Sequence, residues 1–219
     1  MKGKRIILVG ATGMVGGCAL DICLQDPGVE MVAIVGRRST GLKHPKMKEI
    51  LHDDFLDYTT IAHALVDHDA AFYCLGVYTG VVPDDEFRRI TVDYTLAFAA
   101  ALFKESPQAA FCFLSGQGAD PAEQSRVAFA RYKGMAENGL LTIGFPRVHI
   151  FRPGYIYPVT PRKEPNLFYR IFRPIYPLLR CVYPNIGISS EDLARAMVMA
   201  GLYGTGKHDG STGRQRDRP

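Results

Sequence analysis

The sequence of 219 residues predicts an α/β fold built on a parallel sheet. Short β-branched runs alternate with stretches whose apolar residues recur at helical spacing, and the alternation continues from Ile6 to Phe151. The first run, Ile6 to Val9, has no polar residue, which is typical of a strand covered on both faces. The 47% hydrophobic composition is ordinary for a globular core. Together these observations predict a sheet with helices on both sides.

The expected elements follow one another in a regular order along the chain. After the first strand, we expect strands at 29–35, 48–53, 70–75, 110–114 and 148–151. We expect helices at 14–25, 58–66, 84–104 and 123–138. A last helix is expected over 193–202, because Ser189 and Ser190 can cap it and two acids follow in the first turn.

The composition changes after Arg152. Eight of the fourteen prolines lie between Pro146 and Pro184, where they alternate with aromatic residues. Because proline at this density prevents long helices, we interpret 153–188 as a small proline-rich and aromatic cap over the sheet. The sequence therefore predicts one domain over 1–203 that includes this cap, followed by a disordered tail at 204–219 that lacks apolar residues.

The net charge of +4 is concentrated in one part of the chain. Residues 145–184 contain seven basic side chains and one acid, a local charge of +6, so the remainder sums to −2. Such a balance does not indicate a nucleic-acid-binding protein. The basic and aromatic segment 165–183 is open to several interpretations: an interfacial membrane patch, a surface for a protein partner or a second copy of the chain, a lid over an anionic substrate, or a cap packed on the sheet.

Cysteine, histidine and hydropathy patterns exclude several classes of protein. The five cysteines are odd in number and form no CxxC pair, which argues against a disulfide framework or a zinc site. The six histidines show no metal-ligand spacing, so no metal is expected. The apolar runs 6–9 and 96–103 are too short for an export signal or for a transmembrane helix of about 20 residues. We therefore expect a cytoplasmic protein.

A glycine-rich segment stands between the first strand and the first helix. Its residues are Gly10-Ala11-Thr12-Gly13-Met14-Val15-Gly16. Glycines at this turn allow backbone N–H groups to approach a pyrophosphate, whose charge the helix N-terminus stabilises. The segment predicts a doubly wound, Rossmann-type dinucleotide-binding sheet, with Gly10, Thr12, Gly13, Met14, Val15 and Gly16 at the cofactor. The alternative is a tight turn with close helix–strand packing.

The second strand ends in Gly36-Arg37-Arg38. An NAD-specific site places a carboxylate here for the ribose 2′-hydroxyl, whereas a guanidinium can bind a 2′-phosphate in bidentate fashion. Arg37 and Arg38 therefore favour NADP(H) over NAD(H). The alternative is that both arginines are simply solvated.

Several short segments, taken in order, resemble one family. They are the Gly-x-x-Gly-x-x-Gly spacing, Asp54-Phe55, Cys74-Leu75-Gly76, Leu114-Ser115-Gly116-Gln117-Gly118-Ala119-Asp120, Lys133-Gly134 and Phe151-Arg152-Pro153-Gly154. This combination is similar to the extended and atypical short-chain dehydrogenase/reductases, and within them to the Tat-interacting-protein branch. The resemblance extends from about Lys4 to Tyr203 and implies an NAD(P)-dependent oxidoreductase.

The resemblance also implies roles for individual residues. Asp54 would accept from the adenine amino group, and the backbone of Phe55 would lie beside the ring. Leu75, Gly76 and Val77 would line the nicotinamide ribose, whose hydroxyls Lys133 would hold. Ser115 would orient the substrate oxygen. The nicotinamide carboxamide would lie beside Pro153, Gly154, Tyr155 and Ile156.

One position departs from the family pattern. Active members carry Tyr-x-x-x-Lys, but Phe129 stands four residues before Lys133, so the usual general acid is missing. Tyr132 is adjacent to the lysine and points about 100° away on a helix. Ser115, Tyr78, Tyr155 or a water molecule remain candidate proton donors. A tyrosine at 129 is expected to create or raise reductase activity.

Two hypotheses about function follow. The first is an NADP(H)-dependent oxidoreductase acting on a small carbonyl or alcohol, with Ser115 and Lys133 as its catalytic residues. The second is a catalytically silent NADP(H)-binding module with a regulatory or protein-interaction role. Phe129 favours the second, and the retention of Ser115 and Lys133 favours the first. Cys74 is read as a small buried residue, with a reactive thiol near the cofactor as the alternative.

Overall fold

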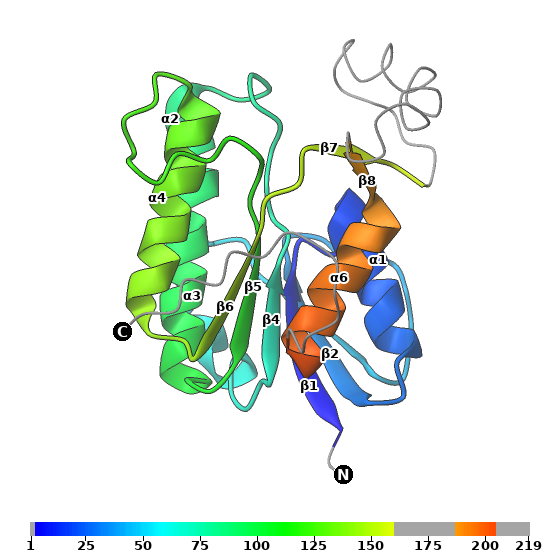
Figure 1. Cartoon of the computed structure of the whole chain (residues 1–219). Coiled ribbons are helices and arrows are strands. Elements are labelled where there is room, and N and C mark those ends of the chain that lie inside the picture. Colours follow the sequence, from blue (N-terminus) through cyan, green and yellow to red (C-terminus); the bar gives the residue numbers. More distant parts are fainter. Residues whose placement is uncertain (1–2, 160–186, 205–219) are drawn as a thin grey trace.

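The central element is a six-stranded parallel sheet with the strand order β3-β2-β1-β4-β5-β6 (Figure 1). The computed structural model describes residues 3–159 and 187–204. The strands are β1 (Lys4–Val9), β2 (Val29–Gly36), β3 (Met47–Leu51), β4 (Ala70–Tyr73), β5 (Ala110–Leu114) and β6 (Arg147–Phe151). The expected doubly wound parallel sheet is therefore confirmed.

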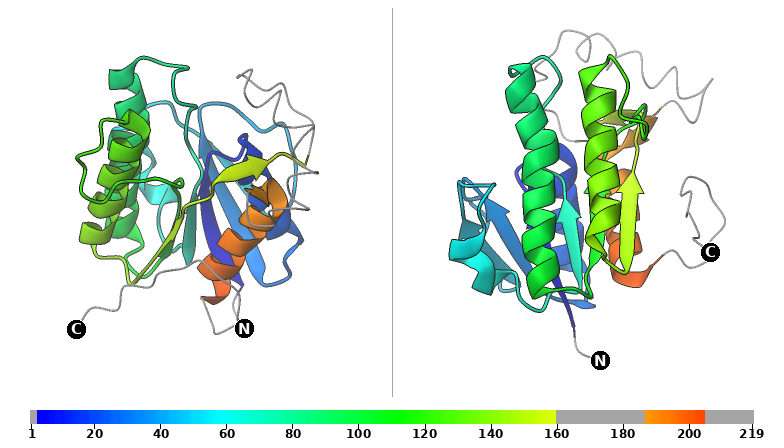
Figure 2. Two further views of the ribbon diagram at one scale, coloured as in Figure 1. Left: turned by 45° about the horizontal axis from the view of Figure 1, so that its top comes forward. Right: turned by 90° about the vertical axis from the view of Figure 1, so that its left-hand side faces the viewer.

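Successive residues of the central strands point to opposite faces of the sheet, and each face has its own apolar core. Ile6 and Leu8 face α1 (Met14–Gln25) and α6 (Ser190–Tyr203), which pack against each other. Ile7 and Val9 face the side covered by α3 (Tyr94–Glu105) and α4 (Ala128–Ile143). Figure 2 shows these two helical layers from the side. Covering both faces explains the uninterrupted apolar runs of the central strands.

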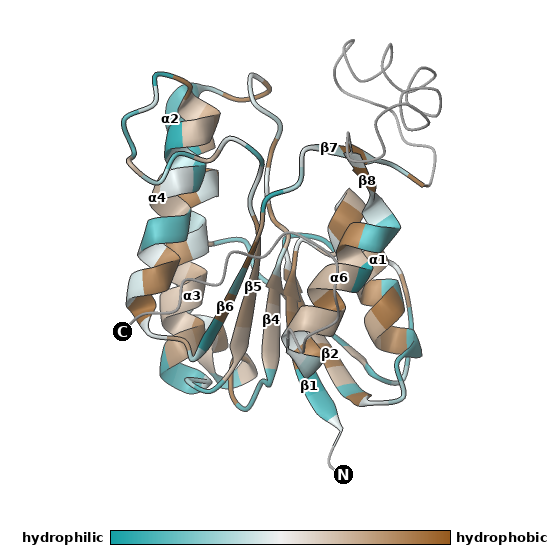
Figure 3. Cartoon of the chain, viewed as in Figure 1, coloured by the Kyte–Doolittle hydropathy of each residue, from teal (hydrophilic) through white to brown (hydrophobic). Residues whose placement is uncertain are grey.

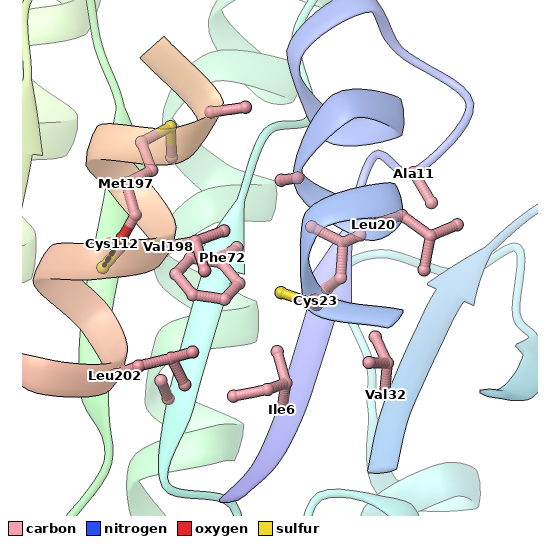
Figure 4. Packing of buried hydrophobic residues seen from close by; sticks show 14 of the residues in the cluster. Ile6, Ala11, Leu20, Cys23, Val32, Phe72, Cys112, Met197, Val198 and Leu202 are labelled. Atoms are coloured by element: carbon pink, nitrogen blue, oxygen red, sulfur yellow. Dashed lines mark hydrogen bonds between the residues drawn. The ribbon is translucent and has the colours of Figure 1, made fainter. Parts of the chain in front are cut away.

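Figure 4 shows part of the core beneath α1 and α6. Phe72 is fully buried between the two helices, and the Cys112 thiol of β5 hydrogen-bonds to the Met197 carbonyl at 3.7 Å. The hydropathy colouring in Figure 3 places apolar shades on the central strands and polar shades on many connecting loops. The sheet is thus a rigid base from which the loops at its carboxyl edge extend.

Three expected helices differ from the structure. The helix expected over 58–66 is a 3-10 helix, Thr59–Ala64. The helix expected over 84–104 consists of α2 (Asp84–Arg88), a π-helical segment (Arg89–Asp93) and α3. The helix expected from residue 123 begins only at Ala128, because Asp120 accepts hydrogen bonds from three backbone N–H groups of the loop and Glu123 has a φ of 60°.

The last helix forms as expected, with Ser189 as its N-cap. The Ser189 hydroxyl accepts a hydrogen bond from the Asp192 N–H at 2.9 Å. Two short strands, β7 (Tyr155–Tyr157) and β8 (Gly187–Ser189), pair in parallel and were not expected. Most of the expected cap at 153–188, the whole segment 165–183 and nearly all of the tail at 204–219 lie outside the described residues.

Candidate functional site

Apart from Lys133, which lies on a helix, the predicted site residues follow the carboxyl ends of strands and therefore lie at one edge of the parallel sheet. The strand order reverses between β1 and β4, because the chain adds β2 and β3 on one side of β1 and β4, β5 and β6 on the other. In open α/β sheets, ligands bind in the crevice outside such a switch point. This edge is at the top of the sheet in Figure 1.

At two glycines of the glycine turn, Gly10 and Gly16, a side chain could not be accommodated. Gly10 has a φ of 92°, and a Cβ there would lie 2.7 Å from the backbone of Cys74 and Leu75. A Cβ on Gly16 would overlap the Gly10 carbonyl oxygen and lie 2.8 Å from its carbon. Gly13 is the N-cap of α1, and it has no side chain to accept hydrogen bonds from the N–H groups of the first turn. The first turn also contains no acidic residue. The turn fits a pyrophosphate, because a bare helix N-terminus at the switch point offers N–H donors to an anion.

The other residues of this turn differ in their exposure. Thr12 is exposed and Met14 is partly buried, so both are accessible from solvent. Val15 is 3% exposed and packs in the core below α1, so only its backbone can contact a ligand.

Arg37 and Arg38 directly follow β2 and are both exposed. Neither forms an ion pair with a carboxylate within residues 3–159 and 187–204. Glu49 of β3 is held by Ser39 and Thr40 instead, and these hydrogen bonds, Ser39 first, lower the pKa of Glu49. The two guanidinium groups are therefore available for an anion at the end of β2.

Asp54 and Phe55 lie in the loop after β3, beside the arginine pair in strand order. Asp54 is exposed, and its carboxylate accepts from the Leu56 N–H at 3.0 Å. The Phe55 ring is 3% exposed and stacks on Tyr94 with centroids 5.5 Å apart. As the resemblance implies, the backbone of Phe55 rather than its ring is what a ligand can contact.

The chain after β4 connects the two halves of the site. The Cys74 N–H donates to the Val9 carbonyl at 2.8 Å, which aligns this segment with the glycine turn. Leu75 and Val77 are partly buried, and Gly76 is exposed with open space where a side chain would be. Burial raises the pKa of the Cys74 thiol to about 12. A thiol of this kind is protonated at neutral pH, which agrees with a packing role for Cys74.

Ser115 is buried at the end of β5 and hydrogen-bonds to a buried carboxylate. Its hydroxyl donates to Glu137 of α4, a residue whose side chain is 2% exposed. The Arg152 guanidinium, from the chain after β6, donates to the same carboxylate, with Nε 3.0 Å from Oε1. This interaction raises the pKa of Arg152. Three separate elements are thus joined at one charged group.

Lys133 lies one helical turn before Glu137 on the same face of α4. It is 9% exposed, and its Nζ donates to the Leu114 carbonyl at 2.9 Å. The ammonium is 4.8 Å from the centre of the Phe113 ring. Burial lowers the pKa of Lys133 to about 8, although the nearby Glu137 acts in the opposite direction. The structure thus brings Ser115 and Lys133 together at the end of β5.

Phe129 occupies the position one turn before Lys133. The tip of its ring, Cζ, packs directly against Gly116, where a Cβ would overlap it. Tyr132 points elsewhere, since its hydroxyl donates to Asp84 of α2 at 2.6 Å and its ring contacts Phe87. The adjacent tyrosine therefore cannot take the place of the missing general acid.

The contact with Gly116 changes what Phe129→Tyr is expected to do. The new hydroxyl would extend from Cζ into the space that Gly116 occupies, so we expect a loss of about 1–3 kcal/mol in stability from overpacking. We also expect no gain in reductase rate from this substitution alone. Chemical denaturation and steady-state rates check both points, and an increased rate at unchanged stability would show that Gly116 moves aside readily.

The last segment of the candidate site follows β6. The Pro153 carbonyl accepts from the Gln117 N–H at 2.8 Å, which ties this segment to the loop after β5. Pro153, Tyr155 and Ile156 are all partly buried. Tyr155 and Ile156 belong to β7, and Ile156 packs against the core below α1 and α6.

Sequence reasoning missed Glu137 and its pairing with Arg152. A signal was present, because Glu137 stands four residues after Lys133 on a helix face that is otherwise buried, together with Ala136 and Leu140. The pairing itself depends on how α4 is rotated against β6. Within the described residues, no group of three or more His, Cys, Asp or Glu side chains could hold a metal ion.

The sequence matches curated proteins over about two thirds of its length. Protein HTATIP2 of Rattus norvegicus is 30% identical over 158 residues, which are 71% of this chain and 64% of that protein. Protein FMP52, mitochondrial, of Meyerozyma guilliermondii is 26% identical over 153 residues, or 69% of this chain and 65% of that protein. The chain thus spans slightly less than two thirds of the length of these relatives. No family model matches the sequence.

Solved structures share the fold at low sequence identity. A short chain dehydrogenase family protein from Francisella tularensis superposes with a TM-score of 0.68 at 14% identity, covering 93% of both chains. WbmH of Bordetella bronchiseptica in complex with NAD+ gives a TM-score of 0.69 at 18% identity, covering 94% of this chain and 74% of that one. Yeast methylglyoxal/isovaleraldehyde reductase Gre2 complexed with NADPH gives 0.64 at 14% identity, covering 90% and 73%.

The fold is a Rossmann-type α/β fold, the same fold as that of short chain dehydrogenase proteins of known structure. The more particular resemblance, to the Tat-interacting-protein branch, is also confirmed, since HTATIP2 and FMP52 proteins are its sequence relatives. No helix within residues 3–159 and 187–204 is long and apolar enough to cross a membrane. The FMP52 relatives are named mitochondrial, so the expected cytoplasmic location stays a prediction.

Proposed function

We propose that the protein is an NADP(H)-binding oxidoreductase of the short-chain type, acting on a small carbonyl or alcohol. The observation that carries the proposal is the glycine turn at the switch point, where Gly10 and Gly16 leave no room for a side chain beside a bare helix N-terminus. Relatives in fold are described with NAD+ and with NADPH, which supports a nicotinamide cofactor.

Each half of the sheet edge would hold one half of the cofactor. The turn from Gly10 to Gly16 would hold the pyrophosphate, and Asp54 with the Phe55 backbone the adenine. On the other half, the segments Leu75–Val77 and Pro153–Ile156 would flank the nicotinamide, whose ring supplies or accepts a hydride when bound. At the end of β5, between these segments, Ser115 would orient the substrate oxygen. Lys133 of α4, whose Nζ reaches the Leu114 carbonyl there, would hold the nicotinamide ribose hydroxyls.

The second candidate function is a catalytically silent NADP(H)-binding module. Phe129 favours it, because no hydroxyl stands at this position and the ring tip is covered by Gly116. NADPH oxidation measured with a panel of small aldehydes and ketones separates the two functions. Turnover of any member supports the oxidoreductase, whereas tight NADPH binding without turnover across the panel supports the silent module.

The arginine pair is proposed to select NADP(H). Replacing both Arg37 and Arg38 with alanine is expected to weaken NADPH binding by tenfold or more, about 1.4 kcal/mol, and to change NADH binding little. Fluorescence titration with each cofactor measures both effects. Lys43→Ala is the matched control, because it removes an exposed positive charge a few residues further along the same connection. Equal losses for NADPH and NADH would refute the 2′-phosphate role.

A further inference from the structure

One face of α4 lies along the chain that follows β5. Phe129, Lys133 and Glu137 are spaced four residues apart, so they form a stripe on one face of the helix. Phe129 covers Gly116, Lys133 donates to the Leu114 carbonyl, and Glu137 accepts from Ser115. Each residue of the stripe thus contacts one residue of the segment 114–116.

The hydrogen bonds of this stripe decide which side chain can release a proton. A serine hydroxyl has one proton, and that of Ser115 is donated to Glu137. Glu137 also accepts from Arg152 Nε, so its carboxylate is held between the Ser115 hydroxyl and a guanidinium. Phe129 has no exchangeable proton. Lys133 has three N–H donors, and one of them is directed to Leu114.

We infer that Lys133 is the proton donor to the substrate oxygen, in the place of the tyrosine that the family uses. The inference rests on the proposed oxidoreductase function. In reduction, a bound reduced nicotinamide would supply the hydride to the carbonyl carbon. The Lys133 ammonium would break one N–H bond and give that proton to the oxygen. The products are an alcohol and a neutral amine, which regains its proton from water. Ser115, its proton held by Glu137, presents an acceptor to the new hydroxyl.

The surroundings of Lys133 suit this role. The groups that face it are Glu137 on its own helix, the Cys74 thiol at the end of β4, and the Phe113 ring and Leu114 carbonyl of β5. Arg152, after β6, reaches this region through its pairing with Glu137. Burial lowers the pKa of Lys133 to about 8, close to the pH at which a general acid works best.

The first test needs neither cofactor nor substrate. Unfolding free energies of the wild-type protein and of Lys133→Met are compared between pH 7 and 10.5. Because the folded protein loses the Lys133 proton near pH 8 and the unfolded chain near 10.5, the stability of the wild type relative to the variant should rise across this window. A difference that stays constant would show that Lys133 keeps its proton, which overturns the inference.

The second test uses turnover of whichever panel compound reacts fastest with NADPH. Lys133→Arg keeps a hydrogen-bonding cation that cannot release its proton at these pH values, so kcat should fall by about 100-fold or more. NADPH affinity should change little. The fall in kcat of the wild type above about pH 8 should disappear in the variant. Lys104→Arg is the control, since Lys104 is exposed near the end of α3.

The outcomes separate the inference from the proposed function. Absence of turnover by the wild-type protein overturns both. Turnover by Lys133→Arg at the wild-type rate and with the wild-type pH profile overturns the inference alone. Loss of kcat in Tyr78→Phe or Tyr155→Phe, with activity retained in Lys133→Arg, would assign the proton to that tyrosine instead. If Lys133→Arg does not fold, the pH dependence of stability decides.

Discussion

Replacing Gly16 with alanine is expected to lower NADPH affinity by about 100-fold, or ~2.8 kcal/mol. The added methyl group would overlap the Gly10 carbonyl oxygen and approach the Cys74 Cβ to 3.2 Å. The turn must then open, and the N–H groups at the start of α1 move away from the pyrophosphate. We also expect a loss of about 3 kcal/mol in stability from overpacking. Fluorescence titration and urea denaturation measure the two effects.

Gly17→Ala is the matched control for this substitution. Gly17 is the next residue of α1, and a Cβ there would lie 3.3 Å from the Ala11 carbonyl oxygen, a contact that small adjustments relieve. Alanine is favoured over glycine inside a helix by about 1 kcal/mol. This gain should offset the cost of the close contact with Ala11, so the free energy of unfolding should change little. Equal loss of NADPH affinity in both variants would show that helix packing, and not the turn, controls binding.

Arg152→Met is expected to destabilise the protein by about 3 kcal/mol at pH 7, because it leaves the buried Glu137 carboxylate without its cationic partner. This loss of stability lies at the lower end of the range for broken buried ion pairs, because the Arg152 side chain is 45% exposed. The double variant Arg152→Met with Glu137→Gln should recover most of the loss, because no buried charge remains. Urea denaturation of the single and double variants measures this coupling.

Arg195→Met provides the comparison. Arg195 pairs with Glu191 at 3.1 Å on the surface of α6, where both side chains are more than half exposed. Such a pair contributes about 0.3–0.5 kcal/mol. If Arg152→Met costs no more stability than Arg195→Met, the buried Glu137 side chain does not depend on Arg152 as its partner.

The sheet could be predicted because its signal is local. Buried strands such as Ile6–Val9 require consecutive apolar residues, and only glycine fits at position 10 directly after the strand, so the sequence shows both features. The start of α4 could not be predicted from helical spacing. The Asp120 carboxylate holds the following loop through backbone hydrogen bonds, an interaction that competes with helix formation until Ala128.

Of the candidate site, too, the sequence predicts the local part and not the contacts between distant elements. Residues at strand ends, such as Arg37 and Ser115, could be placed at the same edge of the sheet because parallel strands end at one edge. The ion pair of Glu137 with Arg152 joins a helix to the end of a different strand, and its existence depends on packing angles that no local pattern contains. For the same reason, the cover of Gly116 over the Phe129 ring could not be foreseen.

The glycine turn and the arginine pair are proposed to form one site for NADP(H). Calorimetric titration of the wild-type protein with NADPH, and in parallel with NADH, tests it most directly. We predict saturable binding of one NADPH per chain, with an affinity at least tenfold higher than that for NADH, about 1.4 kcal/mol. Absence of binding heat with both cofactors, confirmed at a second temperature, would show that this edge of the sheet does not hold the dinucleotide.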